Sequence, residues 1–497
     1  MCALEPDVAS GFYYRATAGR TALFERNPMF KGAVLRYLIS DALSLLGNSI
    51  AGVVLPLVLL ARTGDVLAAG SLALICAVPQ FVCGILGGAL LDRVNRKAVC
   101  VVSDLISALS IALLPVVDDI WGLSFAWFVA LGLLGAVGDV PGMTARDALL
   151  PEVCEREGVD LQRFVGASQS MGSLITIAGP AIAALLIGFM PDVDALWVTA
   201  ACSCAAAAVS ATLPKGVGAI EEHDGMAADA PEGSTAGTHA EALAVNANAE
   251  GAAKPTGSIA ETMGAAGPAS PKAGGLRGLL ETGRAVLTDG LSALFADNRL
   301  LRATTLLSFG VTMIMASWQG IVLPAYFTQL DTPELTGLFV SAMGVGMLVG
   351  SVGYTALASR LSRRGWLTVS LLGMSVGAVG LGMLPNTPLL LASATLVGLF
   401  AGPASALLGF FAFERVPENR RGSAMGTLNA LYLIIGPMGT FLGSTLIAGL
   451  QIKTTGLVLA ALWIAVTLAA LSAPALRDLG DTRDGADDAD AAEPVGV

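Results

Sequence analysis

The chain has 497 residues, of which 54% are hydrophobic and only 13% are charged. A soluble chain of this length normally carries about 25% charged residues, and it could not hide so much apolar surface in one or two cores. The composition therefore excludes an ordinary soluble protein and indicates that lipid surrounds much of the chain. The net charge of −11 argues against nucleic acid as a partner.

The first part of the chain predicts a bundle of six membrane-spanning helices. Residues 1–32 are polar and mixed, and we expect a cytoplasmic N-terminal segment there. Residues 33–213 contain successive apolar stretches, each long enough to cross a hydrocarbon core of about 30 Å. These six predicted spans lie near 35–60, 67–91, 97–117, 121–148, 163–189 and 194–213.

The second part of the chain predicts six more spans after a long interruption. Residues 214–275 are rich in Ala, Gly, Glu, Pro and Thr and are typical of a disordered linker, which we expect in the cytoplasm. Leucines recur at helical spacing within 276–300 and predict an amphipathic cytoplasmic helix. Spans follow within 301–473, near 303–327, 335–358, 366–384, 389–413, 423–449 and 454–473, and an acidic cytoplasmic tail occupies 474–497.

The two sets of six spans resemble each other. The fifth span contains Gly179-Pro180, and the eleventh contains Gly436-Pro437 in the corresponding place. A proline inside a membrane helix bends it and frees a carbonyl, so we expect each pair to act as a hinge or packing site. The prediction is an all-α membrane protein of twelve helices in two six-helix, pseudo-symmetric bundles, which suits a transporter whose halves rock about a central site.

Basic residues predict the orientation in the membrane. The loops after spans 2, 4, 8 and 10 contain twelve Lys and Arg residues by this count, whereas the loops on the other side contain only Arg62 and Lys453. Because cytoplasmic loops carry the excess of Lys and Arg, both termini and the linker are expected in the cytoplasm of a multi-pass plasma-membrane protein. The residues counted are Arg93, Arg96, Lys97, Arg146, Arg156, Arg163, Arg360, Arg363, Arg364, Arg415, Arg420 and Arg421.

A motif between the second and third spans is the most specific local signal. It reads Gly88-Ala-Leu-Leu-Asp92-Arg93-Val-Asn-Arg96-Lys97. This resembles the loop between helices 2 and 3 of the major facilitator superfamily, G-x-L-x-D-R-x-G-R-[RK], with Asn95 in place of the second glycine. Two other stretches, 44–48 (SLLGN) and 414–422 (ERVPENRRG), resemble the enterobactin-exporter and macrolide-efflux branch of drug:proton antiporters.

The resemblance implies a cytoplasmic gate. Asp92, at a helix end, can pair with arginine or face the positive N-terminus of another helix, which by the resemblance is span 11 near Ser423. Breaking that contact would accompany opening toward the cytoplasm. The alternative is that Asp92, Arg93, Arg96 and Lys97 serve only as topology anchors.

Acidic residues inside the spans are candidates for proton coupling, because they are costly in lipid. There are three: Asp41, Asp104 and Asp139. In the superfamily, helices 1, 4, 7 and 10 line the central cavity, which favours Asp41 and Asp139. For Asp104 we expect a structural ion pair with the basic loop, and for Asp41 the alternative is a pair with Arg36 at the membrane edge.

Other polar residues are candidates for the substrate path. Asn48 lies seven residues after Asp41 on the same helix face, and Arg146 lies seven residues after Asp139. Gln319, in the seventh span, is a candidate substrate contact. The alternative for such uncharged side chains is hydrogen bonding between helices.

These observations predict a secondary transporter and not an enzyme. The sequence contains no GxxxxGK[ST] or HExxH, and its cysteines show no CxxC pair, so we expect no nucleotide, cofactor or metal site. The expected function is proton-coupled export of small hydrophobic or amphipathic compounds of the drug, macrolide or siderophore class, by a monomer in the bilayer. The alternatives are an importer or uniporter of a small solute, and a membrane receptor or scaffold on a transporter-like body.

Overall fold

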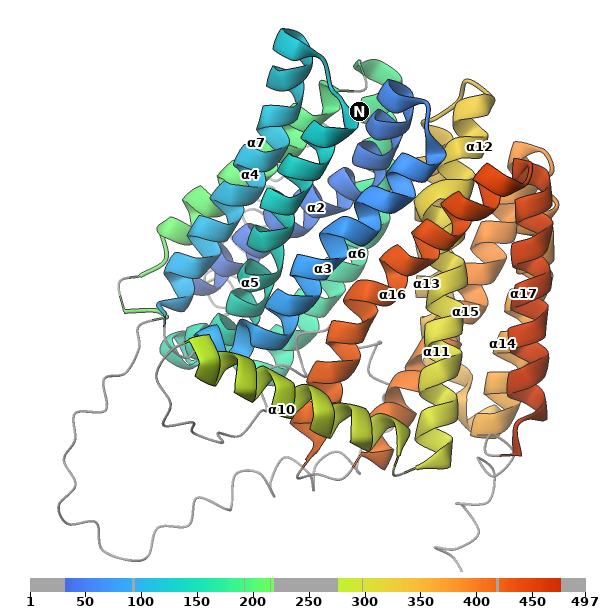
Figure 1. Ribbon diagram of the computed structural model, residues 1–497. Coiled ribbons are helices and arrows are strands. Elements are labelled where there is room, and N and C mark those ends of the chain that lie inside the picture. The colour runs from blue at the N-terminus through green and yellow to red at the C-terminus, as the bar shows by residue number, and fades with distance from the viewer. Residues whose placement is uncertain are drawn as a thin grey trace, which may run out of the picture.

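The computed structural model describes residues 32–91, 94–191, 193–214, 216–218, 276–296, 298–416 and 420–474. All regular elements in these ranges are helical, and Figure 1 shows them as two groups of long helices side by side. Most of the predicted N-terminal segment, linker and acidic tail, together with Asp92 and Arg93, lies outside the described residues.

The first group contains six helices in chain order. They are α2 (Gly32–Thr63), α3 (Val66–Leu91), α4 (Arg96–Trp121), α5 (Phe125–Glu157), α6 (Leu161–Phe189) and α7 (Ala195–Ala211). The second group follows α10 (Leu276–Phe295). It consists of α11 (Arg299–Ser317), the π-helical turn η3 (Trp318–Val322), α12 (Leu323–Gln329), α13 (Leu335–Leu357), the short turn η4 (Ala358–Arg360), α14 (Arg363–Gly382), α15 (Thr387–Arg415), α16 (Arg421–Gly449) and α17 (Ile452–Ser472).

Eleven helices of the described chain are long and apolar enough to cross a membrane; α11, η3 and α12 together form one of them. The remaining predicted span, near 194–213, is α7, whose 17 residues are apolar but shorter. At 1.5 Å per residue, α7 extends for about 26 Å, close to the thickness of a hydrocarbon core. The chain is an all-helical, multi-pass membrane protein.

Polar residues in the loops set the helix starts. The side chains of Asn95, Asp160, Asn298, Ser362 and Asn386 each accept a hydrogen bond from a backbone N–H in the first turn of the following helix. These caps satisfy N–H groups that have no partner within the helix.

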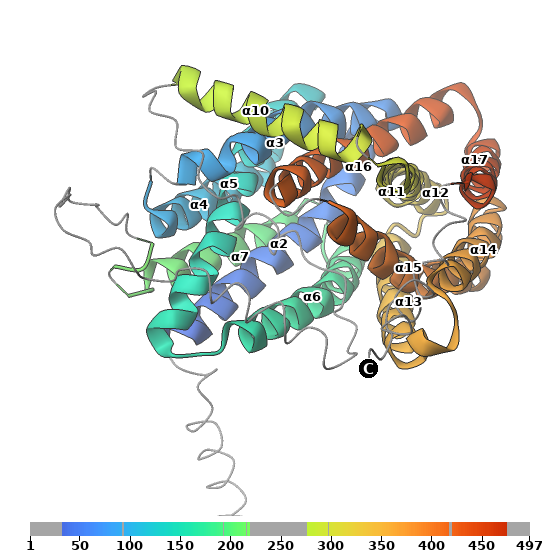
Figure 2. The same cartoon turned by 90° about the horizontal axis from the view of Figure 1, so that it is seen from below.

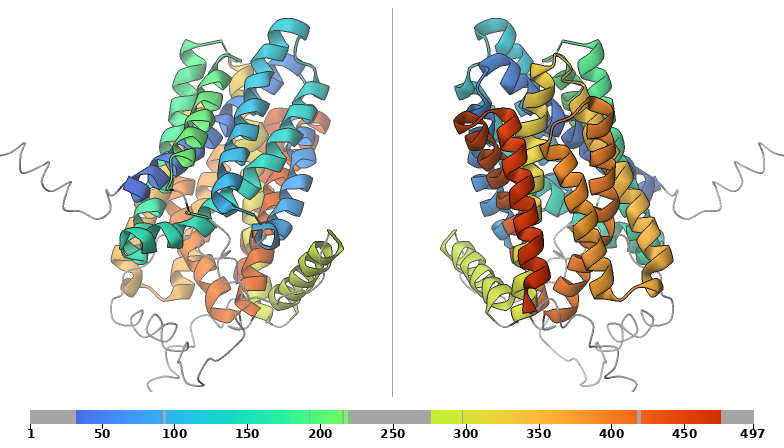
Figure 3. Two further views of the ribbon diagram at one scale, coloured as in Figure 1. Left: turned by 90° about the vertical axis from the view of Figure 1, so that its left-hand side faces the viewer. Right: turned by 90° about the vertical axis from the view of Figure 1, so that its right-hand side faces the viewer.

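The two halves repeat one pattern of packing. In the first half α2 packs on α6 and α7, and α4 packs on α5 and α7, while α3 packs on α5. The second half shows the same pairings, with α11 on α16 and α17, α14 on α15 and α17, and α13 on α15. The repeated pairings give the two groups a pseudo-symmetric relationship (Figures 1 and 3).

Glycines permit the closest helix contact in the second half. Gly346 and Gly350 of α13 lie against the backbone of α15, and Gly398 and Gly402 of α15 lie against the backbone of α13. Both helices therefore carry a G-x-x-x-G pattern on the face that they share, and only residues without a side chain allow this approach.

The most extensive contacts between the halves are made by two pairs of helices, α3 with α16 and α6 with α13, while α2 and α3 also touch η3, and α2 touches α12. The close α6–α13 contacts all lie in the parts of these helices farther from α10; they join Ile177, Pro180 and Ala184 to Gly337, Ser341 and Gly344. Figure 2 shows α10 along one edge of the bundle, beside α3 and α16. We call the end of the bundle nearest α10 the α10 end, and the opposite one the far end.

One residue counted as a loop residue lies elsewhere. Arg146 falls within the predicted span 121–148 although it was counted with the loop, and because helix α5 continues to Glu157, Arg146 lies well inside the helix and is buried. The end of the apolar stretch did not mark the end of the helix, because the last turns of α5 pack against α2 and α4. A helix segment that is covered by protein need not be apolar throughout. The counting of Arg146 among the basic loops was therefore wrong.

Candidate functional site

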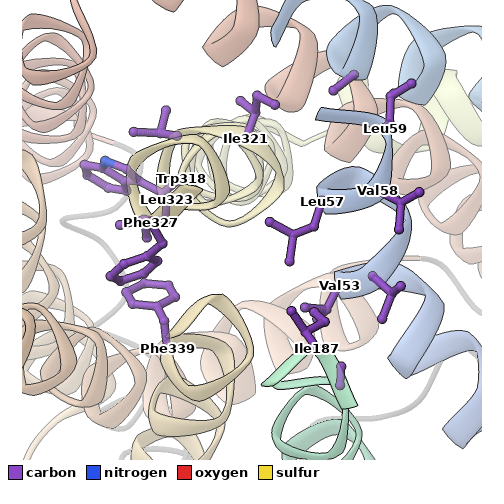
Figure 4. Close-up of a cluster of buried hydrophobic side chains, with 14 of the residues drawn as sticks. Val53, Leu57, Val58, Leu59, Ile187, Trp318, Ile321, Leu323, Phe327 and Phe339 are labelled. Carbon is purple, nitrogen blue, oxygen red and sulfur yellow. The ribbon is translucent and has the colours of Figure 1, made fainter. Parts of the chain in front are cut away.

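A cavity of about 310 Å³ lies between the two halves. The first half contributes Ser49, Gly52, Val53 and Pro56 of α2 and Thr176 and Pro180 of α6; the second contributes Ala316, Gln319, Gly320, Pro324, Thr336, Val340 and Thr440. Figure 4 shows buried apolar side chains of both halves near this interface: Val53, Leu57 and Ile187 belong to the first half, whereas Trp318, Leu323 and Phe339 of the second half point away from them.

The lining of the cavity is neutral. It combines aliphatic surface with hydroxyl groups and one amide, and none of the residues named above carries a charge. Thr336 is only 2% exposed, and within the described chain its hydroxyl has no hydrogen-bond partner. Gln319 donates from Nε2 to the sulfur of Met343 at 3.5 Å, which is a weak acceptor. The Gln319 amide, whose contact is weak, can still bind a ligand that enters the cavity.

A π-helical turn brings Gln319 to this position. Residues Trp318–Val322 interrupt the seventh span, between α11 and α12. Such turns shift the register of the side chains and are frequent at functional sites. Trp318 is fully buried on the other side, against Trp463, while Gln319 and Gly320 line the cavity. The structure therefore places Gln319 on the cavity wall, and its role as a substrate contact stays a prediction.

A second polar site lies inside the first half. Arg146 of α5 donates a hydrogen bond from Nη2 to the carboxylate of Asp104 on α4, and Ser44 of α2 donates to the same carboxylate at 3.2 Å. The Arg146 and Asp104 side chains are 8% and 4% exposed. The buried acid in the third span thus pairs with an arginine of the fourth span and not with the loop after the second.

Two further carboxylates lie near this pair. Asp41 of α2 accepts a hydrogen bond from Ser168 of α6 at 3.3 Å and interacts electrostatically with Arg146. Asp147 interacts electrostatically with both Asp41 and Arg146. We call Asp41, Asp104, Arg146 and Asp147 the charge cluster; it contains three acids and one base.

Asp147 is the member that sequence reasoning missed. It follows Arg146 directly and lies at the very end of the predicted span 121–148, so it was left out of the acids counted inside the spans. The proximity of Asp41 to Asp147 arises from the packing of α2 against α5. A buried Arg-Asp pair in the last turns of a span is the signal that could have found it.

The partners of Asp41 and Asp139 in the structure differ from those that the sequence predicted. Arg36 donates to the Thr212 carbonyl at 2.7 Å, so the structure does not show it paired with Asp41. Asp139 accepts a hydrogen bond from Ser107 of α4 and interacts electrostatically with Asp104 and Arg146, but it is not a partner in the Arg146 ion pair. Asn48 is exposed and lies beside Ser49, but it is not among the residues that line the cavity.

The helices that line the cavity also differ from the expectation. It is lined by the first, fifth, seventh, eighth and eleventh spans, whereas the resemblance implied the first, fourth, seventh and tenth. In the described lining, α5 and α15 contribute no side chain. The reason is that α6 and α13 approach each other closely here, as do α3 and α16, and this brings α6, α13 and α16 to the cavity wall.

The described part of the predicted gate motif binds its own half. Arg96 donates to the Ala148 carbonyl at 3.3 Å, and Lys97 donates to the Leu213 carbonyl at 2.5 Å. Gly88 lies in the last turn of α3. Asp92 and Arg93 lie outside the described residues, so their expected contact with α16 stays a prediction.

The two glycine–proline pairs occupy different surroundings. Gly179 lies so close to Ser49 of α2 that a Cβ would overlap it, and Pro180 lines the cavity. Gly436 has open space where a Cβ would be, and Pro437 is not among the lining residues. Both α6 and α16 continue through their prolines.

Comparison with known proteins gives consistent matches over most of the chain. The family model described as Major Facilitator Superfamily matches residues 37–318 and 305–490. The multidrug efflux pump Tap of Mycolicibacterium fortuitum is 26% identical over 452 residues, covering 90% of this chain and 97% of that protein. Tap of Mycobacterium tuberculosis (strain ATCC 25618 / H37Rv) is 27% identical over 472 residues, covering 94% and 98%.

Solved structures with the same fold are more distant in sequence. The nucleoside transporter NupG has a TM-score of 0.64 and 12% identity, covering 88% of this chain and 98% of NupG. A bacterial homologue of the iron transporter ferroportin, in its inward-facing state, has a TM-score of 0.57 and 17% identity over the same shares of the two chains. At these identities the likeness concerns the fold.

Proposed function

Because the chain belongs to the major facilitator superfamily, and is therefore a membrane transporter and not an enzyme, we propose that it exports small hydrophobic or amphipathic compounds in exchange for protons. The observation that carries this proposal is the arrangement of two sites on one pair of helices. A neutral cavity and a cluster of three acids around one arginine both involve α2 and α6. The similarity to the Tap efflux pumps along nearly the whole chain supports export.

The cavity supports the proposed class of substrate. Its lining offers apolar surface together with a few hydroxyl groups and the Gln319 amide, and it offers no charge to balance an ionised ligand. Small-molecule sites commonly combine an apolar wall with a few placed polar groups. An amphipathic compound with one or two hydrogen-bonding groups fits such a wall, with its polar part near Gln319 and Thr336.

The charge cluster supports proton coupling. Arg146 offsets one negative charge, and the Asp104 carboxylate accepts its hydrogen bond. A second ionised carboxylate buried nearby has no such counter-charge, and burying an unbalanced charge is costly. Binding a proton at Asp41 or Asp147 removes that charge, so we propose these two residues as the proton carriers, in place of Asp139.

A contact between α2 and α6 links the two sites. Asp41 of α2 accepts a hydrogen bond from Ser168 of α6. Ser49 lies about 12 Å farther along α2 and packs against Gly179 of α6. When Asp41 gains or loses a proton, its hydrogen bond to Ser168 changes character, and the packing of α2 on α6 changes at the cavity. Protonation and substrate binding are thereby coupled through one helix pair, as alternating access requires.

The basic residues support the orientation. Leaving out Arg146, and Arg93, which lies outside the described residues, the basic residues counted above still concentrate on the α10 end, whereas Arg62 and Lys453 are at the far end. We therefore propose that the α10 end faces the cytoplasm of a plasma-membrane protein, with both termini on that side.

The test compares accumulation of fluorescent amphipathic compounds and macrolides in cells that express the wild-type protein, Asp41→Asn, Asp147→Asn or Asp139→Asn. Export by the wild-type protein should fail when a protonophore dissipates the gradient. Asp41→Asn or Asp147→Asn should abolish uphill export, and Asp139→Asn should retain it. Loss of export in Asp139→Asn alone would move the proton site to Asp139, and a wild-type protein that exports no compound would contradict the proposed class of substrate.

A further inference from the structure

Helix α10 joins the two halves of the bundle at one edge. It packs on α3 of the first half and on α16 of the second (Figures 1 and 2). Its outer face is polar and exposed at Glu281, Arg284 and Thr288, while its inner face is covered. An amphipathic helix that covers both halves is positioned to respond to their relative movement.

The second half of α10 is anchored to α16 by a directional polar network. Arg420 donates from Nε to Asp289 Oδ1 and from Nη2 to the Asp289 carbonyl, both at 2.8 Å, and also donates to Ser292 Oγ at 2.5 Å. Ser423, in the first turn of α16, donates to Asp289 Oδ2 at 2.7 Å. Such charge-assisted bonds define the position of α10 on α16.

Tight packing reinforces this anchor. A Cβ at Gly290 would overlap the side chain of Thr427 and lie about as close to the Ser423 carbonyl, so α10 and α16 approach with no side chain between them. Leu294 is fully buried in a cluster with Leu301 of α11 and Ala424 of α16. This part of α10 therefore belongs to the second half of the bundle.

The contact of α10 with α3 has a different nature. At Gly283, a Cβ would lie 2.8 Å from Leu86 Cδ2 and 3.0 Å from Ile85 Cγ2, so the backbone of α10 rests on two apolar side chains of the first half. Van der Waals contact of this kind is not directional, and a gap of about 0.5–1 Å between the surfaces already removes about a quarter to a half of the attraction. One part of α10 is thus fixed by polar bonds, and another part rests on an apolar surface.

We propose that α10 is a conformational strap: it moves with the second half and rests on α3 in only one of the two access states. This rests on the proposed alternating-access transport. If the halves rock, α3 moves relative to α16, and because Asp289 and Gly290 tie α10 to α16, the contact of Gly283 with Leu86 separates. The strap stabilises the present state by holding α3 against α16.

A reversible disulfide tests this strap. The variant carries Leu86→Cys and Gly283→Cys in a chain whose native cysteines are replaced by serine or alanine; removing the Leu86 side chain makes room for the new Cβ. The matched control carries Asp289→Cys and Ser423→Cys, which replaces the polar anchor by a covalent one. Oxidation should stop export by the first variant and leave the control exporting, and reduction should restore the first. Export that continues through the oxidised 86–283 disulfide would overturn the strap.

A second readout separates the strap from the proposed function. Thr176→Cys, on the cavity wall, is labelled with an impermeant maleimide from each side of membrane vesicles, using a reagent that leaves the strap disulfide intact. The oxidised 86–283 pair should confine labelling to one side, and the oxidised 289–423 pair should leave the labelling pattern of the reduced protein. Unchanged labelling with the 86–283 disulfide would also overturn the strap. If the reduced protein exports no compound but labelling is confined as expected, the proposed substrate class is wrong while the strap stands.

Discussion

Arg146 of α5 and Asp104 of α4 form an ion pair within the first half of the bundle, with side chains 8% and 4% exposed. The Nε atom of Arg146 has no hydrogen-bond partner within the described chain. The guanidinium therefore still has a donor available for a second carboxylate, and Asp41, Asp147 and Asp139 interact with it electrostatically. An arginine that can change partners connects the structural ion pair to the proposed proton carriers.

Breaking this ion pair is expected to destabilise the protein strongly. Asp104→Asn leaves the buried Arg146 without its counter-charge, and removal of one partner of a buried pair costs about 3–5 kcal/mol. The matched control is Asp118→Asn, which breaks the more exposed pair of Arg62 with Asp118 and should cost less than about 1 kcal/mol. Thermal unfolding in detergent measures both. Equal losses in the two variants would contradict the buried character of the Arg146 pair.

The glycine contact between α13 and α15 makes a second prediction. A Cβ at Gly350 would overlap the Leu399 carbonyl group, so Gly350→Ala should destabilise the protein by about 1–3 kcal/mol. Gly353, on the same helix, has open space around it, and Gly353→Ala should stabilise by up to about 1 kcal/mol because alanine favours the helix. Comparable unfolding temperatures in detergent would show that α13 and α15 do not approach as closely as described.

Gln319 is expected to influence which compounds are exported. Gln319→Leu keeps the volume of the side chain but removes its hydrogen-bonding amide from the cavity wall. A typical hydrogen bond is worth about 0.5–1.5 kcal/mol, so compounds that bind the amide should lose roughly two- to tenfold in affinity. Purely apolar compounds should be exported as before. Competition for export across a panel measures the effect, and a uniform loss for every compound would exclude a role in selectivity.

The contact of Gly70 with Ser444 leads to a prediction about how the packing of α3 on α16 at the far end affects export. Gly70 of α3 leaves no room for a side chain, since a Cβ would lie 2.7 Å from Ser444 Cβ and 3.0 Å from Phe441 Cα. Gly70→Leu should push α3 from α16 at the far end and reduce export, and Ser444→Gly in the same chain should recover part of it. Gly188→Leu, in open space on α6, is the control. Labelling of Thr176→Cys from the side of the far end should increase in Gly70→Leu only.

The sequence alone determined the helical membrane fold. Apolar stretches near twenty residues have one stable solution in lipid, because a helix satisfies its own backbone hydrogen bonds. The repeated Gly-Pro pairs indicated two related halves, and the motif from Gly88 to Lys97 indicated the superfamily. Gln319 could be proposed for the cavity because a polar side chain inside a membrane span needs a hydrogen-bond partner.

The tertiary structure decided which of the buried acids meet. Asp104 and Arg146 lie 42 residues apart on neighbouring helices, and their contact depends on how α4 and α5 are rotated about their axes. Sequence spacing relates residues within one helix, such as Asp139 and Arg146, but it does not relate the faces of different helices. The same holds for Asp289 and Arg420, whose bond exists only because α10 packs across α16. Packing between helices sets these rotations, so the charge cluster, the cavity wall and the contacts of α10 from which the strap is proposed were visible only in three dimensions.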